Sequence, residues 1–503
     1  MTAAAFLALG AALVAARAEE PPLPEGLSPQ APAPAGPSPS EPALPEGLGG
    51  AQKDAAPGEP ALPEGLGPPA RTAEPALPEG IAAPTAKPPE QPSAPAAPRR
   101  PQLPFDLSGF WELRGGVRTQ RDPYERQASI GETRLQVQVE KSFERLSLRL
   151  TSDFLYDPVL DEHGVRLEEG RGAVDLREAW VLARPAGFLD VKAGRQVLTW
   201  GTGDLLFLND LFPKDWNAFL IGRDVEYLKA PSDALKVSLF SKVANLDLVY
   251  TPRFDADRFI DGRQISYYNP VLGRLAGRDA VVRPLKPDTV FTDDEIAGRA
   301  YRMIGAYEAA VYGYRGFWKS PMGLDPASGR ATFPPLAVYG ASLRGPVGKG
   351  IGNLEFAWYD SLDDPGGDDP FVPNRQWRLL AGYEQELAPN FTAAVQYYVE
   401  VMMDYGAYRA SLPPGTPRSD RQRHVLTLRL TRLLMDQNLA LSLFAFYSPT
   451  DSDAYLRPHA RYRIDDHWSV EGGANVFFGN HDHTFFGQFR RDSNVYAAVR
   501  YSF

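Results

Sequence analysis

The sequence predicts an all-β chain that closes into a membrane-spanning antiparallel barrel of about eighteen strands, with sixteen as the alternative count. Three observations carry this prediction. Apolar and polar residues alternate with period two in a long series of segments. The connections between those segments are short and long in turn. The chain ends within a strand-like segment on a terminal aromatic residue, Phe503.

The first element is a short apolar leader. Residues 3–16 form an apolar run that is too short to span a bilayer as a helix. Ala16-Arg17-Ala18 follows the small-x-small pattern of a cleavage site. We therefore predict a secretory signal peptide over residues 1–18.

Residues 19–104 form the second element, which is dominated by Pro, Ala, Glu and Gly. Such a stretch buries too little apolar surface to offset the entropy of folding, so we predict a disordered extension. Within it Leu-Pro-Glu-Gly, followed by Leu or Ile, recurs from residues 23, 44, 62 and 77. The repeats are consistent either with drift in a low-complexity sequence or with a multivalent tether that docks a partner protein.

From residue 105 onward the chain alternates. Trp111, Leu113 and Val117 are separated by Glu112, Arg114 and Arg118. The same pattern recurs at residues 133–140, 146–151, 391–400, 426–431 and 456–464. A soluble all-β protein would need a second layer to cover the apolar faces, whereas here nearly every strand has a polar face rich in Arg, Glu and Gln. A barrel with lipid outside and water inside fits this pattern.

The connections supply an independent check. Short turns are predicted at residues 141–144, 184–187, 243–245, 305–306, 345–350, 388–390, 435–438 and 465–467. Longer loops are predicted at residues 318–334, 360–374, 405–420 and 479–492. Division of residues 295–318 around Gly305-Ala306 into two strands keeps this order. A barrel of this size is too wide for its own side chains to fill, so we expect a water-filled lumen.

The final strand carries apolar residues on one face and polar residues on the other. Val495, Val499, Tyr501 and Phe503 share the apolar face. A chain that stops on Phe at the end of such a strand resembles the C-terminal signal of Gram-negative outer-membrane β-barrels. The resemblance implies that Tyr501 and Phe503 form an assembly signal read by the barrel-assembly machinery. It also implies contact with outer-membrane lipid and lipopolysaccharide, and a periplasmic extension at the N-terminus.

A second resemblance lies at the end of a predicted strand. Gly194-Arg195-Gln196 and Trp200-Gly201, followed by an Asp-rich stretch, resemble a G-R-Q-x-x-x-W-G motif of porin-like families, some of them uncharacterised. Arg195 falls on the apolar parity of its strand. We expect either a bulge at Gly194 that turns Arg195 inward, or an Arg195 that reaches the membrane rim.

Residues 201–221 mix an apolar run with charged residues. This composition predicts a loop folded into the lumen as a constriction, and the alternative is a loop that caps the outer mouth. The candidate constriction residues are Asp204, Asp210, Lys214 and Asp215.

Basic residues predominate on the lumen parity of the C-terminal strands. They are Arg429, Arg457, His459, Arg461, Arg463 and Arg500. We expect several of them to lie within about 10 Å of one another and to favour anions. Acidic residues on the same parity oppose this preference, namely Glu112, Glu140, Glu384 and Glu400.

Other chemistry finds little support in the sequence. His481-Asp482-His483 offers fewer ligands than a metal site usually has, and acidic residues 363–369 suit a solvated loop better than a Ca²⁺ site. The absence of Cys excludes thiolate chemistry, and a net charge of −10 is unlike that of a nucleic-acid binder. We therefore predict no enzyme activity, no cofactor and no metal.

The sequence favours a passive outer-membrane channel for small polar solutes, with anionic solutes preferred. Two alternatives from other classes stay open. One is an export or envelope-assembly barrel whose extension docks periplasmic partners. The other is a barrel hydrolase, because catalytic residues need not be close in sequence.

Overall fold

The computed structural model describes residues 104–503, and they form one closed antiparallel barrel. The predicted signal peptide, the extension and its four repeats lie outside the described residues. The barrel sheet contains 18 strands, which confirms the predicted count over the alternative of sixteen.

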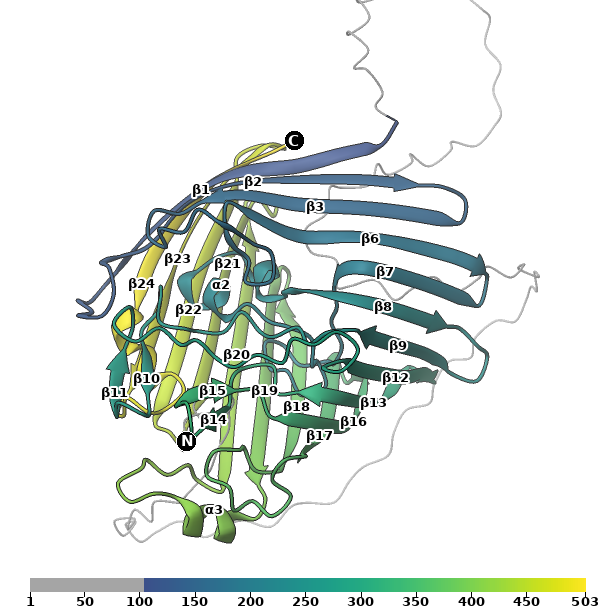
Figure 1. The fold of residues 1–503 in the computed structure, drawn as a ribbon. Coiled ribbons are helices and arrows are strands. Elements are labelled where there is room, and N and C mark those ends of the chain that lie inside the picture. Colours follow the sequence, from purple (N-terminus) through teal and green to yellow (C-terminus); the bar gives the residue numbers. More distant parts are fainter. Residues whose placement is uncertain (1–103) are drawn as a thin grey trace, which may run out of the picture. The chain divides into compact units, whose positions relative to one another are not determined.

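The wall strands run in chain order around the barrel (Figure 1). They are β1 (Asp106–Arg118), β2 (Ala128–Ser142), β3 (Leu146–Tyr156), β6 (Val174–Ala186), β7 (Leu189–Val197), β8 (Pro231–Leu239), β9 (Asn245–Thr251), β12 (Glu295–Ile304), β13 (Tyr307–Phe317), β16 (Pro335–Val347), β17 (Gly350–Ser361), β18 (Gln376–Ala388), β19 (Phe391–Met402), β20 (Gln422–Leu434), β21 (Leu439–Ser448), β22 (Asp453–Arg463), β23 (Trp468–Gly479) and β24 (Asn494–Ser502).

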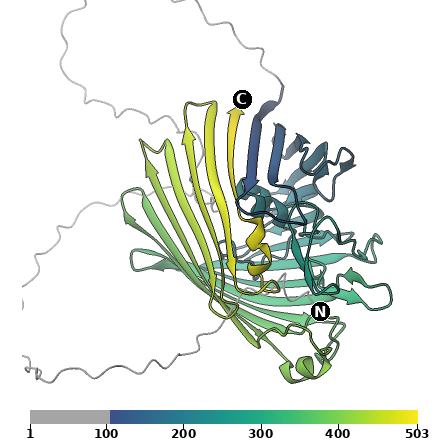
Figure 2. The same cartoon turned by 90° about the vertical axis from the view of Figure 1, so that its left-hand side faces the viewer.

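The first and last strands close the barrel. β1 pairs with β2 on one side and with β24 on the other, so that Leu113 lies between Thr133 and Val499. Figure 2 shows β24, in yellow, beside the purple β1 at this seam. Closure leaves the sheet without a free edge, which is what a lipid environment requires.

Short and long connections alternate as predicted. Each predicted turn lies at the end of the barrel where β24 finishes, and we call this the turn end. Gly305, with φ +61°, forms the tight turn between β12 and β13. The longer connections lie at the opposite end, the loop end. They contain the hairpins β4 (Val165–Arg166)–β5 (Arg171–Gly172), β10 (Tyr267–Asn269)–β11 (Arg274–Ala276) and β14 (Gly323–Asp325)–β15 (Arg330–Thr332).

The outside of the wall is apolar. Leu113, Val311, Phe356, Val395 and Val499 are all exposed there. Aromatic side chains that are at least a third exposed lie near both ends, with Tyr339, Tyr447 and Phe478 toward the loop end and Tyr307, Tyr462 and Trp468 toward the turn end. An apolar band between two aromatic girdles is the surface of a barrel that spans a bilayer.

Helices are few and short in residues 104–503. They are α2 (Trp216–Ile221), α3 (Tyr405–Ser411) and the 3₁₀ turns η1 (Val225–Leu228) and η2 (Gly487–Asp492). None of the helices in this part of the chain has the length and apolar character needed to cross a membrane.

Two long connections occupy the interior. We call residues 198–230, between β7 and β8, the inner segment, and residues 252–294, between β9 and β12, the capping segment. The inner segment contributes Leu206, Leu208, Phe212 and Phe219 to a buried apolar cluster, and inward-facing wall residues such as Tyr455 complete it. The apolar core of this protein therefore lies inside the barrel.

Candidate functional site

The inner segment begins at a constrained turn. Gly201 has φ +84°, and a side chain there would approach the Glu355 carboxylate at 3.2 Å. Trp200 packs edge-on against Phe212, with ring centroids 4.9 Å apart, and against Tyr312 of the wall. These contacts direct the chain from the end of β7 into the barrel.

The first part of the inner segment, residues 202–209, crosses to the far wall. There Glu355 of β17, only 1% exposed, accepts hydrogen bonds from the backbone N–H groups of Thr202 and Gly203 and from the Asn209 amide. Asn353, on the same face of β17, donates to the Thr202 hydroxyl at 3.1 Å. We call residues 202–209 the tip of the inner segment, and Glu355 is its main anchor.

The tip continues to β19 and β20. The Gln396 side chain accepts from the Asp204 backbone N–H at 2.7 Å, and Arg429 forms an ion pair with the Asp204 carboxylate at 2.5 Å. Both side chains of this pair are 35% exposed, so water reaches it. Burial raises the pKa of Asp204, and the charge of Arg429 opposes that shift.

Asp210 and Lys214 bind each other rather than facing open lumen. Their side chains are almost fully buried and 2.9 Å apart, and the Thr199 hydroxyl donates to Asp210. The Lys214 ammonium also lies over the Phe207 ring. The pair satisfies both charges inside the inner segment, so removal of either partner would leave an uncompensated buried charge.

Asp215 caps α2. Its carboxylate accepts from the Ala218 N–H at 2.8 Å and pairs with Arg258 of the capping segment, which also binds Asp175 of β6. The helix ends at Gly222, where φ is +90° and a side chain would collide with the Tyr496 ring. Only glycine fits both the conformation and the space.

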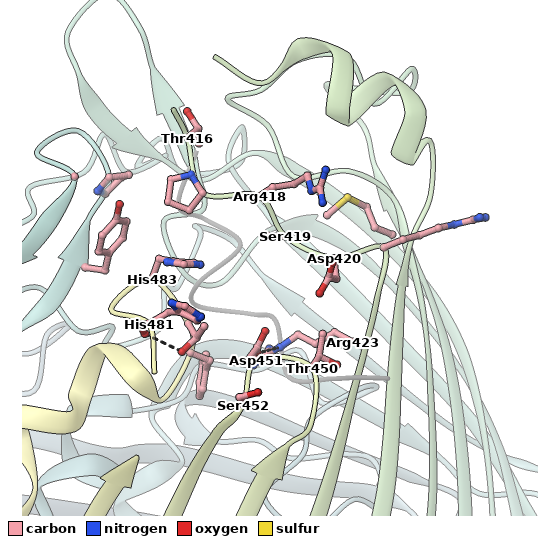
Figure 3. A pocket seen from close by; sticks show the side chains of 18 of the residues that line it. Thr416, Arg418, Ser419, Asp420, Arg423, Thr450, Asp451, Ser452, His481 and His483 are labelled. Carbon is pink, nitrogen blue, oxygen red and sulfur yellow. Dashed lines mark hydrogen bonds and ion pairs between the residues drawn. The ribbon is translucent and has the colours of Figure 1, made fainter. Parts of the chain in front are cut away.

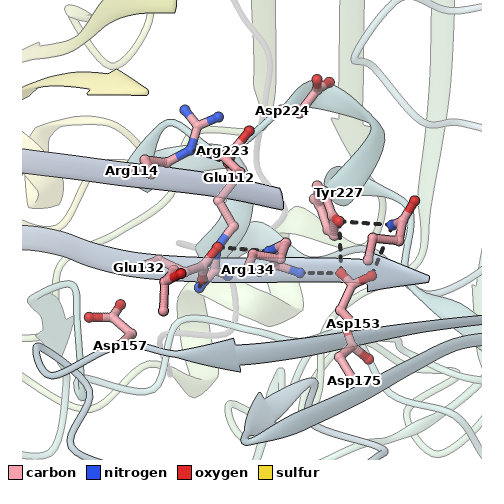
Figure 4. A network of polar contacts seen from close by, with 12 residues as sticks. Glu112, Arg114, Glu132, Arg134, Asp153, Asp157, Asp175, Arg223, Asp224 and Tyr227 are labelled. Atoms are coloured by element: carbon pink, nitrogen blue, oxygen red, sulfur yellow. Dashed lines mark hydrogen bonds and ion pairs between the residues drawn. The ribbon is translucent and has the colours of Figure 1, made fainter. Parts of the chain in front are cut away.

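The return stretch, residues 222–229, is tied to the opposite wall (Figure 4). Arg114 donates to the Gly222 carbonyl at 2.7 Å. Arg223 binds Glu132 at 2.6 Å, and the Tyr227 hydroxyl donates to Asp153 at 2.7 Å. Arg134 links Glu132 to Asp153, so that β1, β2 and β3 hold the stretch through one continuous buried network.

The predicted lumen arginines occupy different environments. Arg461 and Arg500 both pair with Asp224 of the return stretch, at 3.7 and 3.5 Å, and Arg500 also pairs with Glu112. Arg457 is buried beneath Phe219 of α2 and donates to the Arg223 carbonyl.

The other two predicted basic side chains of β22, His459 and Arg463, lie on either side of Arg461 along the strand. His459 lies 3.5 Å from Glu471, which also binds Arg114. Arg463 donates to Asn438 of a turn. Of the acidic residues predicted on lumen parity, Glu140 pairs with Arg149 and Glu400 with Arg378, while Glu384 is exposed.

These contacts correct one expectation. The lumen is not an open water-filled space over its whole length, because the inner segment touches strands on opposite sides of the wall and packs an apolar core between them. Parity predicted which side chains face inward, but it did not reveal that so many of them bind the inserted chain. Residues 201–221 are folded into the barrel rather than across its mouth, and their role as a constriction stays a prediction.

The Gly194-Arg195-Gln196 motif lies at the loop end of β7. The ladder from β7 to β8 runs through Gly194 and Arg195 without a register shift, so the expected bulge is absent. Arg195 instead stays on the outward parity and forms a two-pronged ion pair with Asp233 of β8, at 2.7 and 2.8 Å. Gln196 is buried and donates to the Ala234 carbonyl. Of the two arrangements expected from the sequence, Arg195 therefore has the second, in which it lies at the membrane rim.

The terminal aromatic residues lie at the turn end of the seam. Tyr501 packs against Trp468 of β23, with centroids 5.0 Å apart. Phe503 exchanges two backbone hydrogen bonds with Gly109 of β1, and its side chain is 45% exposed. Phe503 is therefore exposed and Tyr501 half-buried at this end of the wall, and their role as an assembly signal stays a prediction.

His481 and His483, in the loop before β24, contact each other through their rings. The rings of His481 and His483 stack 5.4 Å apart, and Asp482 pairs with Arg490. Within residues 104–503 no group of three or more His, Asp or Glu side chains is placed to hold a metal ion.

Sequence reasoning missed Glu355, Arg223 and the two carboxylates Glu132 and Asp153. Glu355 and Glu132 lie on the polar parity of clearly alternating strands, so the sequence pattern was enough to predict that they face inward. Their partners were not, because each partner lies in the inner segment or on a strand that only the closed barrel brings near.

Comparisons with known proteins add a general likeness. No family model matches the chain, and no curated protein matches it. Among solved structures the chain is similar to OccAB3 of Acinetobacter baumannii, at 12% identity over 79% of this chain and 99% of that one, with a TM-score of 0.48. It is also similar to OmpF of Salmonella typhi in complex with daunomycin, at 9% identity over 79% and 97% of the chains and a TM-score of 0.40. An engineered mutant of the Rh. blastica porin matches at 9% identity over 79% and 100%, with a TM-score of 0.34.

These neighbours are bacterial porins, and residues 104–503 of this chain also form a closed barrel. Each of these TM-scores is below 0.5, so function is inferred below from the geometry of the chain itself.

Proposed function

We propose that the protein is a passive outer-membrane channel for small polar solutes, narrowed by its inner segment. One observation carries the proposal. A closed 18-stranded wall with an apolar outside encloses a polar, ion-paired interior, and an infolded segment crosses that interior. The loop end then faces the outside of the cell and the turn end faces the periplasm.

The path runs beside the tip, past the Asp204–Arg429 pair. Among the ion pairs that attach the inner segment to the wall, this one is the most exposed at both partners, whereas Arg223–Glu132 is buried and Arg500–Asp224 is mostly buried. Water and small solutes pass where charged side chains remain hydrated, and the apolar cluster of the inner segment excludes them from the space between.

A weak preference for anions follows from the charge count around the return stretch. Around Asp224, three guanidinium groups, those of Arg114, Arg461 and Arg500, pair with three carboxylates, those of Glu112, Asp224 and Glu471. The guanidinium of Arg457 binds the neighbouring Arg223 carbonyl and adds one positive charge. The excess of one positive charge attracts anions, and the pairing keeps the preference small.

Reconstitution of the full chain in a planar lipid bilayer tests the proposal. We expect steady, ohmic single-channel currents and a reversal potential shifted slightly toward anion selectivity in a salt gradient. Correctly folded barrels that carry no current under any salt or voltage would refute it. No observation in residues 104–503 specifically favours the export or hydrolase alternatives, and the docking of partners by the repeats stays a prediction.

A further inference from the structure

A cavity of about 530 Å³ opens at the loop end, above the inner segment (Figure 3). Its walls come from the connection between β19 and β20, the turn between β21 and β22, the loop before β24 and the β10–β11 hairpin. We call this cavity the vestibule. It is formed by segments that are far apart in the sequence and that meet only because the barrel closes.

The vestibule contains polar groups that lack partners. Arg423 of β20 is 5% exposed, and its Nε donates to Asp451 at 2.5 Å. Its Nη1 and Nη2 atoms are buried and have no hydrogen-bond partner, and neither does the Thr450 hydroxyl. Figure 3 shows Arg423, Thr450 and Asp451 beside one another. Buried donors without acceptors are costly, and those of a guanidinium are among the most costly.

Neither of the other carboxylates near Arg423 bonds to its free donors. Glu400 lies opposite Arg423 in the ladder, but it pairs with Arg378 at 3.3 Å and accepts from the Tyr398 hydroxyl at 2.9 Å. Asp453 accepts from the backbone N–H of Phe486 at 2.8 Å through Oδ2, and its buried Oδ1 has no hydrogen-bond partner. The free donors of Arg423 and Thr450 therefore suit an acceptor that comes from outside the chain, and an anion fits best.

Apolar groups adjoin these donors. The Phe485 ring centroid lies 5.6 Å from the guanidinium carbon of Arg423. Phe485 also lines a second, smaller cavity of about 90 Å³, which lies between the inner segment and the wall. Its walls include Phe207, Trp216, Trp318, Tyr359 and Tyr398. Phe485 thus joins a polar chamber to an aromatic slot.

We propose that the vestibule binds a small carboxylate with a planar apolar body. The carboxylate accepts from Arg423 and Thr450, and the body packs against Phe485 at the entrance to the aromatic slot. The inference rests on the proposed function, because it treats the vestibule as the outer entrance of the channel and names the solute class held there.

Binding to the full-length protein in detergent tests the site independently of conduction. Benzoate is the probe, acetate is the probe without the apolar body, and benzyl alcohol is the probe without the charge. By isothermal titration calorimetry we expect benzoate to bind more tightly than either. Arg423→Gln should weaken benzoate binding by about 10- to 100-fold, the range for hydrogen bonds to a charged group.

Arg421→Gln is the matched control, since Arg421 lines the same vestibule but is exposed. It should leave benzoate binding within about twofold. Thr450→Val removes one hydroxyl at nearly constant volume and keeps the test valid if Arg423→Gln fails to fold, as judged by migration of unheated protein on a gel. We expect Thr450→Val to weaken benzoate several-fold, and Phe485→Leu to weaken benzoate but not acetate.

Equal binding of benzyl alcohol and benzoate would overturn the proposal, as would benzoate binding that Arg423→Gln and Thr450→Val leave unchanged. Equal binding of acetate and benzoate would overturn the part played by Phe485. Failure of the proposed function has a different signature, since a barrel that binds benzoate but carries no current would refute the channel and leave the site intact.

Discussion

The anchor Glu355 allows a sharp test of how the inner segment narrows the lumen. Glu355→Gln keeps the size of the side chain but removes its charge, and it places an amide NH₂ among groups that donate. The wild-type carboxylate accepts three hydrogen bonds from the tip, from the N–H groups of Thr202 and Gly203 and from Asn209. Gln keeps one carbonyl oxygen that can still accept from Thr202 and Gly203, so the substitution removes the bond from Asn209 to Oε2 and the charge that strengthens the other two. Attachment of the tip should weaken by about 2 kcal/mol, on the order of 30-fold.

Single-channel recording is the assay. We expect Glu355→Gln to show a larger mean conductance, or frequent steps to a larger one, because the tip leaves β17 for part of the time. Glu384→Gln is the control, since Glu384 has lumen parity on the neighbouring strand but is exposed. A Glu355→Gln channel with wild-type conductance and noise, in a barrel that still migrates as folded, would refute the idea that this anchor sets the width.

Four further predictions follow from the same structure. Deletion of Phe503 should reduce the yield of heat-modifiable barrel in the outer membrane, and a normal yield would contradict its role in assembly. A chain without residues 19–104 should still fold and conduct, because the described wall is closed without them; loss of folding would disprove this. Arg461→Glu with Arg463→Glu should move the reversal potential toward cation selectivity, and an unmoved potential would place both outside the conducting path. Burial raises the pKa of Asp204, so acidification should protonate Asp204 and break its pair with Arg429 at a pH above the usual pKa range of Asp, about 4. The current should change at that pH, and Asp204→Asn should abolish the change. A change in current that persists in Asp204→Asn would belong to another group.

Period-two alternation was enough to predict the wall. The inward direction of Arg429, Arg461 and Arg500 followed from parity alone, because successive residues of a strand face opposite sides. The turn at Gly305 followed from the order of short and long connections. These features are local, or depend only on the rule that strands alternate in direction.

The interior was less predictable for a physical reason. Arg457 and Arg461 have the same parity on one strand, yet the first is buried beneath Phe219 and the second pairs with Asp224. The difference depends on where α2 and the return stretch lie, and contacts between residues more than 200 positions apart determine that. Arg195 shows the same limit, since its partner Asp233 lies on the next strand beyond the whole inner segment.

The central claim is that a passive channel is narrowed by its inner segment, and a reversible cross-link tests it most directly. The chain has no Cys, so Thr202→Cys with Asn353→Cys introduces a unique pair where the Asn353 amide lies 3.1 Å from the Thr202 hydroxyl. In the Glu355→Gln background, a short thiol-reactive cross-linker should return the enlarged, fluctuating single-channel conductance to the steady wild-type value, and its reductive release should restore the larger one. A conductance that does not respond to the link, or folded barrels that carry no current, would contradict the account.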